Sequence, residues 1–450
     1  MDLFYTLLSF IAFSLLGIFL VFCFIMLTTI LGKSIGDPDY APVKGTVFNQ
    51  LFYFNTLHDY QAEMAKTIPT FRLLAPDQSE VYTADPRNIE HILKTNFDKY
   101  SKGKYNQDIV TDLFGEGIFA VDGDKWRQQR KLASYEFSTR VLRDFSCSVF
   151  RRNAAKLDIL MRCTLDSIFK VGFGAELNCL EGSSKEGSRF MKAFDESNAL
   201  IYWRYVDPFW KLKRFLNIGC EATLKRNIRI IDGFVHENAK EDILSRFLIE
   251  SKKYKETMTD QYLRDIILNF MVAGKDTSAD TLSWFFYMLC KNPLVEEKIV
   301  QEVRDVTCSH ESEESIDKFV AKITDDTLDK MHYLHAALTE TLRLYPAVPV
   351  VPSMKLSHKH IVYAEEFRPE RWLNNGVFES QSPFKFIAFN AGPRICLGKD
   401  FAYRQMKIIA MALVRFFKFK LANGTQNVTY KVMLTLHIDK GLPLCAIPRL

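Results

Sequence analysis

The chain has 450 residues, of which 48% are hydrophobic and 25% are charged, so most of it can fold around a large apolar core. Its formal net charge of +5 is small for this length, and its lysines and arginines form no dense block. We therefore expect no nucleic-acid partner. The nine cysteines are dispersed without a C-x-x-C pair, which argues against a disulfide framework or a zinc knuckle and indicates a reducing compartment.

The first residues predict a membrane anchor, residues 1–32. Residues 3–32 contain no charged side chain, and this run is longer than the roughly 20 residues that a helix needs to cross a bilayer. It is also longer than the apolar part of a cleaved signal peptide, about 7–15 residues; an uncleaved export signal is the alternative. Asp2 precedes the run and Lys33 follows it, so the positive-inside rule places the rest of the chain in the cytosol.

The remaining chain divides into a linker and one domain. Residues 33–50 are expected to be the linker, because residues 36–45 contain two prolines and two glycines. Residues 51–450 would form the globular part. From about residue 125 to residue 300 apolar side chains recur with a period near 3.6, while period-2 alternation occurs near residues 51–100 and 417–438. The sequence therefore predicts a mainly α fold with small β-sheets at the two ends.

Three local patterns give more specific expectations. Asp85 should cap a helix whose first turn contains Pro86. Residues 260–291 predict one continuous helix, about 48 Å long. Residues 417–421 and 428–438, separated by an Asn-Gly turn at 423–424, predict a β-hairpin.

The strongest motif is the loop FNAGPRICLG at residues 389–398, with the pattern F-x-x-G-x-R-x-C-x-G. A cysteine in a glycine-bent loop, followed by a helix that begins near Lys399, can remain a thiolate and ligate a metal. Zinc would need further cysteine or histidine ligands at short spacing, and the next cysteine is Cys445. A single thiolate with Arg394 beside it suits haem iron, because the arginine can bind a propionate.

Three weaker motifs stand elsewhere in the chain. Trp126 and Arg130 lie at i,i+4, so an indole N–H and a guanidinium can meet one carboxylate. Residues 273–278, AGKDTS, interrupt the apolar face of the predicted long helix with a carboxylate and a hydroxyl that could relay protons. Glu340 and Arg343 lie at i,i+3, and Arg371 in FRPERW could share the Glu340 carboxylate.

In this set the chain resembles the microsomal cytochromes P-450, and FRPERWLNNGVF and FIAFNAGPRICLGKDFAYRQMK are similar to plant enzymes that hydroxylate fatty acids at the ω end. The resemblance implies a haem b cofactor (iron protoporphyrin IX) and a cytosolic domain anchored in the endoplasmic reticulum membrane. Glu340, Arg343 and Arg371 would form a structural network. The other expected roles are Cys396 as the iron ligand, Phe389 packed beside its loop, Gly392 and Gly398 permitting close approach, Trp126, Arg130 and Arg394 binding propionates, and Asp276 and Thr277 delivering protons.

The resemblance also implies partners. Electrons would come from NADPH through a flavoprotein reductase, which could dock on basic residues near the cysteine loop. These residues are Arg127, Lys131, Lys385, Lys399, Arg404 and Lys407. The substrate would be apolar, a long-chain fatty acid, although a terpenoid or steroid also fits the apolar channel residues Ala347, Val348, Val350 and Leu436.

One interval departs from the family pattern. Only twenty-three residues separate Arg343 from Phe367, whereas the strands and helix expected there need roughly 40 residues or more. Shorter gaps are indicated near residues 157–158 and 233–242. This short interval favours one alternative to a monooxygenase, a shortened, inactive product that binds haem poorly. A second alternative, independent of the interval, is an oxygen-independent isomerase or dehydratase of fatty-acid hydroperoxides. Asp276 and Thr277 argue against the second, because proton delivery to bound oxygen would have no purpose there.

Overall fold

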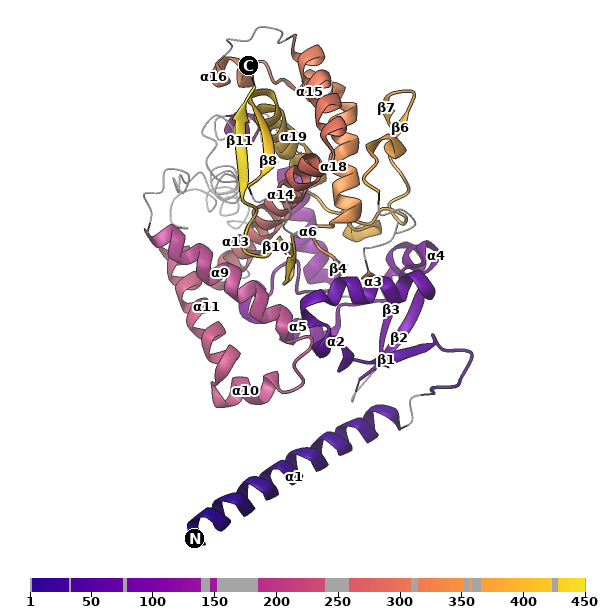
Figure 1. Cartoon of the computed structure of the whole chain (residues 1–450), viewed down its shortest axis with the longest axis vertical. Helices are drawn as coiled ribbons and strands as arrows, with labels where there is room; N and C mark the ends of the chain where they lie inside the picture. The colour runs from indigo at the N-terminus through magenta and orange to yellow at the C-terminus, as the bar shows by residue number, and fades with distance from the viewer. Residues whose placement is uncertain are drawn as a thin grey trace.

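The structure is a computed structural model that describes residues 2–31, 34–75, 79–138, 146–151, 185–238, 259–308, 315–351, 356–357, 366–422 and 428–449. Helices form most of the body, and strands gather near its N-terminal and C-terminal parts (Figure 1). This confirms the predicted fold class. The apparent gap near residues 157–158 lies outside the described residues, as does part of the one near residues 233–242.

Helix α1 (Asp2–Ile30) stands apart from the body in Figure 1. It is long and apolar enough to cross a membrane, and none of its most apolar part is buried against the body. The chain then enters β1 (Val43–Thr46), which pairs with β2 (Thr70–Leu74). Ordered sheet structure thus begins inside the segment that we expected to be a linker.

The N-terminal sheet has five strands in the order β1-β2-β3-β5-β4, with β3 at Glu80–Thr83, β4 at Val350–Val351 and β5 at Leu356–Ser357. The last two strands are minimal: β5 meets β3 at a single residue pair, Thr83 and Leu356. The short helices α2 (Asn49–Phe52) and α3 (Leu57–Thr67) lie beside this sheet. Helix α4 (Pro86–Glu90) begins as predicted, with the Asp85 carboxylate accepting the N–H of Arg87.

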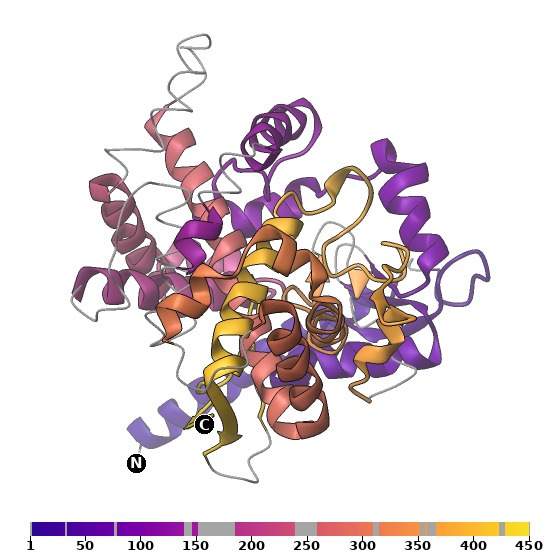
Figure 2. The same cartoon turned by 90° about the horizontal axis from the view of Figure 1, so that it is seen from above.

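Two groups of helices build the main core. Helix α19 (Lys399–Phe416) lies in the middle of the first group, and every residue from Met406 to Val414 is buried (Figure 2). Around it pack α14 (Asp276–Lys291), α15 (Pro293–Thr307), α16 (Ile316–Ala321), α17 (Asp325–Lys330) and α18 (His332–Leu344). The second group contains α5 (Gly103–Phe114), α9 (Lys185–Trp203), α10 (Trp210–Leu216), α11 (Gly219–Asn238) and α13 (Asp260–Gly274). Helix α6 (Gly123–Ser138) carries the Trp126 motif.

The prediction of one helix over residues 260–291 is wrong at a single residue. Helix α13 ends at Gly274 and α14 begins at Asp276, with Lys275 between them. Glycine has a low helix propensity. In addition, the Thr277 hydroxyl donates to the Ala273 carbonyl at 2.5 Å, a side-chain bond of the kind that bends helices.

The predicted C-terminal hairpin is also wrong in its pairing. Strand β8 (Phe417–Leu421) pairs with β11 (Leu444–Pro448), and β9 (Tyr430–Val432) pairs with β10 (Leu436–Ile438). The predicted turn at residues 423–424 lies outside the described residues. Alternation identifies a strand but not its partner, and β10 is fixed by contact with α14, where the Trp284 indole donates to the Leu436 carbonyl at 2.8 Å.

A short hairpin precedes the cysteine loop. Strands β6 (Leu373–Asn374) and β7 (Val377–Phe378) are joined by Asn375-Gly376, with φ of 50° and 82°. Positive φ at both positions is the requirement of a type I′ turn. This hairpin was not predicted, although an Asn-Gly pair close to apolar residues on both sides is a usable sequence signal for one.

Candidate active site

The cysteine loop is held by its own backbone and by one glycine. The Cys396 N–H donates to the Phe389 carbonyl at 2.8 Å, which closes the loop just before α19. Gly392 has φ of +60°, and a Cβ there would lie 1.9 Å from the Leu93 carbonyl oxygen. Glycine is therefore required at this position for the loop to pack against residues 91–95.

The Cys396 side chain is accessible to solvent, yet protein atoms on its other sides shield it from much of the surrounding water. Burial raises the pKa of its thiol, whereas a hydrogen bond from the Gly398 N–H and the charges of Arg130 and Lys399 act in the opposite direction. These three groups would each stabilise a thiolate. Among the described residues, no group of three or more His, Cys, Asp or Glu side chains that could hold a metal ion is found around Cys396.

Arg394 lies against the Trp126 motif. Its guanidinium stands 4.4 Å from the centre of the Trp126 ring and donates to the Asp122 carboxylate at 2.5 Å. Asp122 also accepts the backbone N–H of Lys102 at 2.7 Å. Asp122 was not among the predicted site residues, and its position four residues before Trp126 is its only signal in the sequence.

Lys102 is a second residue of this region that was not predicted. Its ammonium donates to the carbonyl oxygens of Ile118 and Phe119. Burial and the nearby Arg394 charge lower its pKa to about 7, while Asp122 acts in the opposite direction. Lys102 therefore ties the loop before α6 to the surroundings of the cysteine loop.

Arg130 is the residue that best fits an anionic cofactor group. It is half-buried and forms no ion pair with a carboxylate in the described part of the chain. Burial lowers the pKa of its guanidinium, and a Cys396 thiolate would raise it. A buried cation needs a counter-charge, and a haem propionate would supply one. Trp126, Arg130, Pro393 and Leu397 also line an open hollow of about 590 Å³. The single thiol and this cation thus fit haem b.

On α14, Asp276 does not stand free. It is 1% exposed and pairs with the Lys275 ammonium, and its second oxygen accepts from the Asn198 amide on α9 at 3.2 Å. Lys275 also pairs with Asp195 at 2.8 Å. Burial raises the pKa of Asp276 to about 6, against the effect of Lys275. Lys275 and Asn198 were not predicted as partners, because Asn198 meets Asp276 only when α9 crosses α14.

A second buried acid lies one turn further along α14. Asp280 is 1% exposed and contacts the His437 Nδ1 atom on β10 at 2.8 Å. Burial alone would lower the pKa of His437, but the hydrogen bond and charge of Asp280 raise it. This pair joins α14 to the C-terminal hairpin.

Glu340, Arg343 and Arg371 meet as the sequence predicts. The Glu340 carboxylate, 0% exposed, accepts from Arg343 at 2.8 and 2.9 Å and from Arg371 at 2.7 Å. It also accepts from the Trp372 indole at 2.8 Å and the Arg368 N–H at 3.0 Å. Burial would raise the Glu340 pKa, but these hydrogen bonds lower it. Glu340 is therefore a charged, fully bonded centre that fastens the FRPERW segment to α18.

The predicted basic docking surface is smaller than expected. Lys407 is 6% exposed and donates to the Leu328 carbonyl at 2.6 Å, so it is unsuited to bind a partner. Arg404 is paired with Asp325. The error arose because helical spacing does not tell which face of α19 is buried. Arg127 pairs with Asp98 and Asp124 but remains exposed, and Lys385 is exposed as well.

Comparison with known proteins bears on this site. The family model described as cytochrome P-450 matches residues 36–362 and 353–442. Cytochrome P-450 704C1 of Pinus taeda is 48% identical, covering 91% of this chain and 93% of that protein. Cytochrome P-450 704B1 of Arabidopsis thaliana is 39% identical, covering 90% and 93%. Cytochrome P-450 94C1 of Arabidopsis thaliana is 34% identical, covering 87% and 89%.

The same comparison marks an internal gap. The two matched segments meet at residues 353–362, inside the short interval after Arg343. The alignment with the pine protein runs over 481 positions, more than the 450 residues of this whole chain. The relative therefore carries internal residues that have no counterpart here.

Proposed function

Because this chain belongs to the cytochrome P-450 family of monooxygenases, we propose that it inserts one oxygen atom from O2 into the ω-terminal C–H bond of a long-chain fatty acid. NADPH would supply the electrons through a flavoprotein reductase. The observation that carries the proposal is the Cys396 loop, closed by its backbone and set beside the half-buried Arg130. Cys396 would ligate haem b, and Arg130, Arg394 and Trp126 would bind its propionates.

When bound, a thiolate-ligated haem activates molecular oxygen for C–H hydroxylation. The chain contributes positioning and protons. Gly392 brings the loop close to Leu93, and the Gly398 N–H, Arg130 and Lys399 stabilise negative charge on the Cys396 sulfur. Phe389 packs beside Tyr403, with ring centres 5.2 Å apart, which supports the loop from the side of α19.

Asp276 and Thr277 would move protons. Burial raises the pKa of the Asp276 carboxyl toward neutral pH, against the effect of Lys275, which suits a group that releases and regains a proton. It lies inside the protein, held by Lys275 and Asn198, so its proton is separated from bulk solvent. The Thr277 hydroxyl donates to Ala273 and would turn from that carbonyl to pass a proton on.

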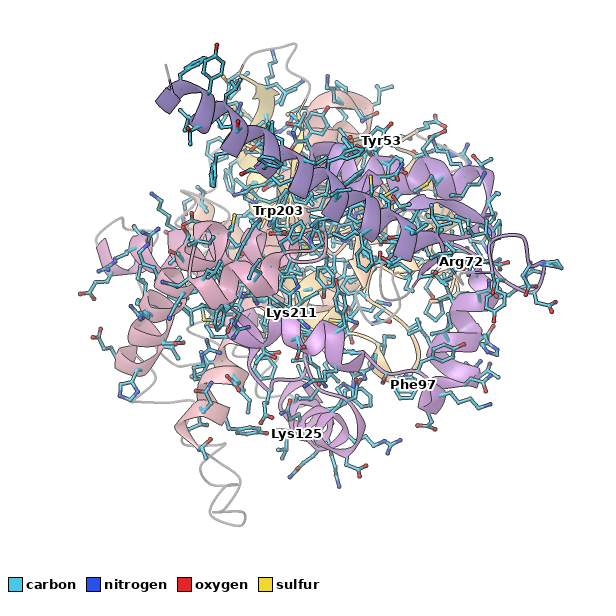
Figure 3. All side chains as sticks on the ribbon, turned by 90° about the horizontal axis from the view of Figure 1, so that it is seen from below. Tyr53, Arg72, Phe97, Lys125, Trp203 and Lys211 are labelled. Atoms are coloured by element: carbon cyan, nitrogen blue, oxygen red, sulfur yellow. The ribbon has the colours of Figure 1, made fainter. Side chains whose placement is uncertain are left out.

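The membrane location rests on two features at one end of the molecule (Figure 1). Helix α1 projects from this end, and α10 lies at the same end of the body. Figure 3 views this side, with Tyr53, Trp203 and Lys211 in the field. The side chains around α2 and α10 that expose large apolar area are Phe52, Phe209, Leu212, Phe215, Leu216 and Ile218. We assign this end to the bilayer surface and the rest of the domain to the cytosolic face of the endoplasmic reticulum.

The decisive experiment is the carbon monoxide difference spectrum of the reduced protein. Wild type should give a thiolate-type band, and Cys396→Ala should lose it while keeping its helical circular dichroism. A band that survives in the variant would refute the ligand assignment. Product analysis with NADPH, reductase and saturated fatty acids of several lengths then tests ω-selectivity.

A second candidate is favoured by the split of the family match within residues 353–362. In this version the chain is a shortened product that retains haem poorly. The minimal pairing of β5 with β3, one residue pair, agrees with it. Haem content of the purified protein discriminates the two: well below one haem per chain supports the second candidate, and full occupancy with a stable thiolate spectrum rejects it.

A further inference from the structure

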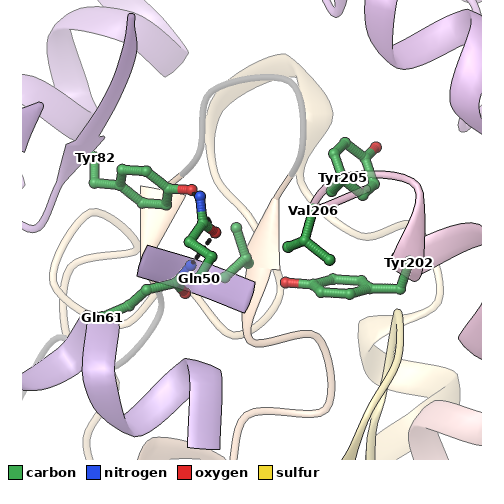
Figure 4. Close-up of a pocket in the computed structure, with 7 residues that line it drawn as sticks. Gln50, Gln61, Tyr82, Tyr202, Tyr205 and Val206 are labelled. Atoms are coloured by element: carbon green, nitrogen blue, oxygen red, sulfur yellow. Dashed lines mark hydrogen bonds between the residues drawn. The ribbon is translucent and has the colours of Figure 1, made fainter. Parts of the chain in front are cut away.

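A small pocket lies between the N-terminal sheet and the end of α9 (Figure 4), and none of its lining residues belongs to the cysteine loop. Its walls come from α2, α3, β3, β4 and the end of α9, and it measures about 20 Å³, enough for one water-sized group. The lining residues are Gln50, Gln61, Tyr82, Tyr202, Tyr205, Val206 and Val350. Val350 is also one of the residues that the sequence leads us to expect in the substrate channel, so the pocket and that channel would share a wall.

The polar groups of the pocket are only partly satisfied. Gln61 is 2% exposed, and its amide nitrogen donates to the Gln50 carbonyl at 3.3 Å. The Gln50 amide nitrogen in turn donates to the Glu80 carboxylate at 3.3 Å. The Gln61 carbonyl oxygen is buried and accepts no hydrogen bond in the described chain. Leaving a buried acceptor without a hydrogen-bond donor costs folding free energy. The Gln61 oxygen therefore indicates that a bound group supplies the donor.

Tyr202 provides the complementary group. It is 6% exposed, and its hydroxyl points across the pocket toward the two glutamines (Figure 4). Burial raises the pKa of this phenol, so it stays protonated and able to donate. The pocket therefore offers an acceptor at Gln61 and a donor at Tyr202.

Only some chemical groups can form hydrogen bonds with both the Gln61 carbonyl oxygen and the Tyr202 hydroxyl. A hydroxyl can donate to Gln61 and accept from Tyr202. An ionised carboxylate can only accept, and it would face the Gln61 carbonyl together with the nearby Glu80 charge. No lysine or arginine is among the residues that line the pocket in the described chain, and an alkyl end would leave both polar groups unpaired.

We propose that this pocket binds the terminal hydroxyl of a long-chain aliphatic alcohol and thereby selects a neutral rather than an ionised polar end. The inference rests on the proposed hydroxylation of a long aliphatic chain, but it names an alcohol in place of the fatty acid proposed above, because the pocket disfavours an ionised carboxylate. The elements that carry the lining residues of the pocket, among them α2, α3 and β3, lie toward the end of the body from which α1 extends (Figure 1). An amphiphile leaving the bilayer would keep its hydroxyl here, with its chain directed past Val206 and Val350 toward the interior.

The test is equilibrium binding of radiolabelled ligands to the full-length holoenzyme in lipid nanodiscs, which needs no turnover. The ligands are hexadecan-1-ol, which donates and accepts, its methyl ether, which only accepts, and hexadecanoate. Wild type should bind the alcohol about 5-fold more tightly than the ether, the value of one hydrogen bond of ordinary strength. Gln61→Met should remove this difference, and Tyr202→Phe should weaken alcohol and ether alike.

Gln405→Met is the matched control. Gln405 on α19 is 1% exposed, and its amide also makes no hydrogen bond in the described chain, but it lies outside the pocket. This variant should keep the full preference for the alcohol. Equal binding of alcohol and ether to wild type would overturn the proposal, because the pocket then holds only water. Tightest binding of hexadecanoate, unchanged in Gln61→Met, would also overturn it.

Failure of the pocket assignment and failure of the proposed reaction give different results. A protein that prefers the alcohol but produces no ω-hydroxylated product retains the pocket assignment and refutes the proposed reaction. If Gln61→Met fails to fold, binding to Tyr202→Phe is the test. Weaker binding of the alcohol to that variant supports the proposal, and unchanged binding contradicts it.

Discussion

Lys407 is a buried cation whose charge is unfavourable in the folded protein. Burial lowers its pKa from 10.5 to about 8, against the attraction of Glu302 and Asp329. Between pH 8 and 10.5 the unfolded chain therefore holds more protons than the folded chain, so stability should rise with pH across this window. Below pH 8 the charged Lys407 ammonium lowers the free energy of unfolding by its full amount, about 3 kcal/mol.

The substitution Lys407→Met should remove this rise of the free energy of unfolding with pH. At pH 7 the variant should be more stable by about 2 kcal/mol, because the hydrogen bond to Leu328 is lost while the desolvation cost disappears. Urea unfolding at pH 7 to 10.5 measures the effect. Lys225→Met, at an exposed site on α11, should keep the wild-type slope. A Lys407→Met protein with the same pH dependence as wild type would contradict the prediction.

Glu340 is a buried carboxylate that holds α18 to the FRPERW segment. Glu340→Gln removes the charge that neutralises Arg343 and Arg371 while leaving those guanidinium groups in place. Because breaking a buried ion pair leaves an uncompensated charge, we expect a loss of about 3–5 kcal/mol. The comparison variant is Glu90→Gln, which breaks an exposed i,i+4 pair with Lys94 and should cost less than about 1 kcal/mol. Similar midpoints of urea unfolding for both variants would argue against the structural role.

At the scale of elements, the junction between α13 and α14 is held to α9 by Lys275. Its ammonium is 0% exposed and pairs with Asp195 on α9 and with Asp276 on α14. Lys275→Met leaves the buried Asp276 without its counter-charge, and we expect a loss of about 3–5 kcal/mol. Adding Asp276→Asn should recover a large part of that loss, because the uncompensated charge is then removed.

A double-mutant cycle with Lys275→Met, Asp276→Asn and the double variant measures this coupling by urea unfolding. Purely additive losses would show that the two side chains do not interact. Hydrogen exchange of α9 and α14 should quicken in Lys275→Met while α5 and α11 change less, because this cation pairs with carboxylates on the first two helices.

At the scale of the whole molecule, membrane attachment should have two components. Deleting residues 2–30 removes α1 but leaves the exposed apolar side chains on α10. The deleted protein should still partition weakly onto phosphatidylcholine vesicles, and Leu212→Ser with Phe215→Ser should abolish that residual binding. Vesicle sedimentation measures both steps. Complete release on deletion of α1 alone would show that the body makes no contact of its own.

Local chemistry explains which features could be predicted from the sequence. The apolar N-terminal helix, the helical body, the capped start of α4 and the pairing of Glu340 with Arg343 depend on neighbours within a few residues, and periodicity records such neighbours directly. The cysteine loop was recognisable for the same reason, because its glycines, arginine and cysteine are contiguous.

What only the tertiary structure decided involves partners far apart in the chain. The pairing of β8 with β11, the burial of Lys407, the contact of Asn198 with Asp276 and the cavity between Gln61 and Tyr202 each depend on how helices and strands cross. Side-chain spacing fixes the face on which a residue lies but not what packs against that face. The sequence by itself therefore determined the family and the cysteine that would bind iron, whereas the fold decided which buried charges surround the site and which side chains line the pocket beside the N-terminal sheet.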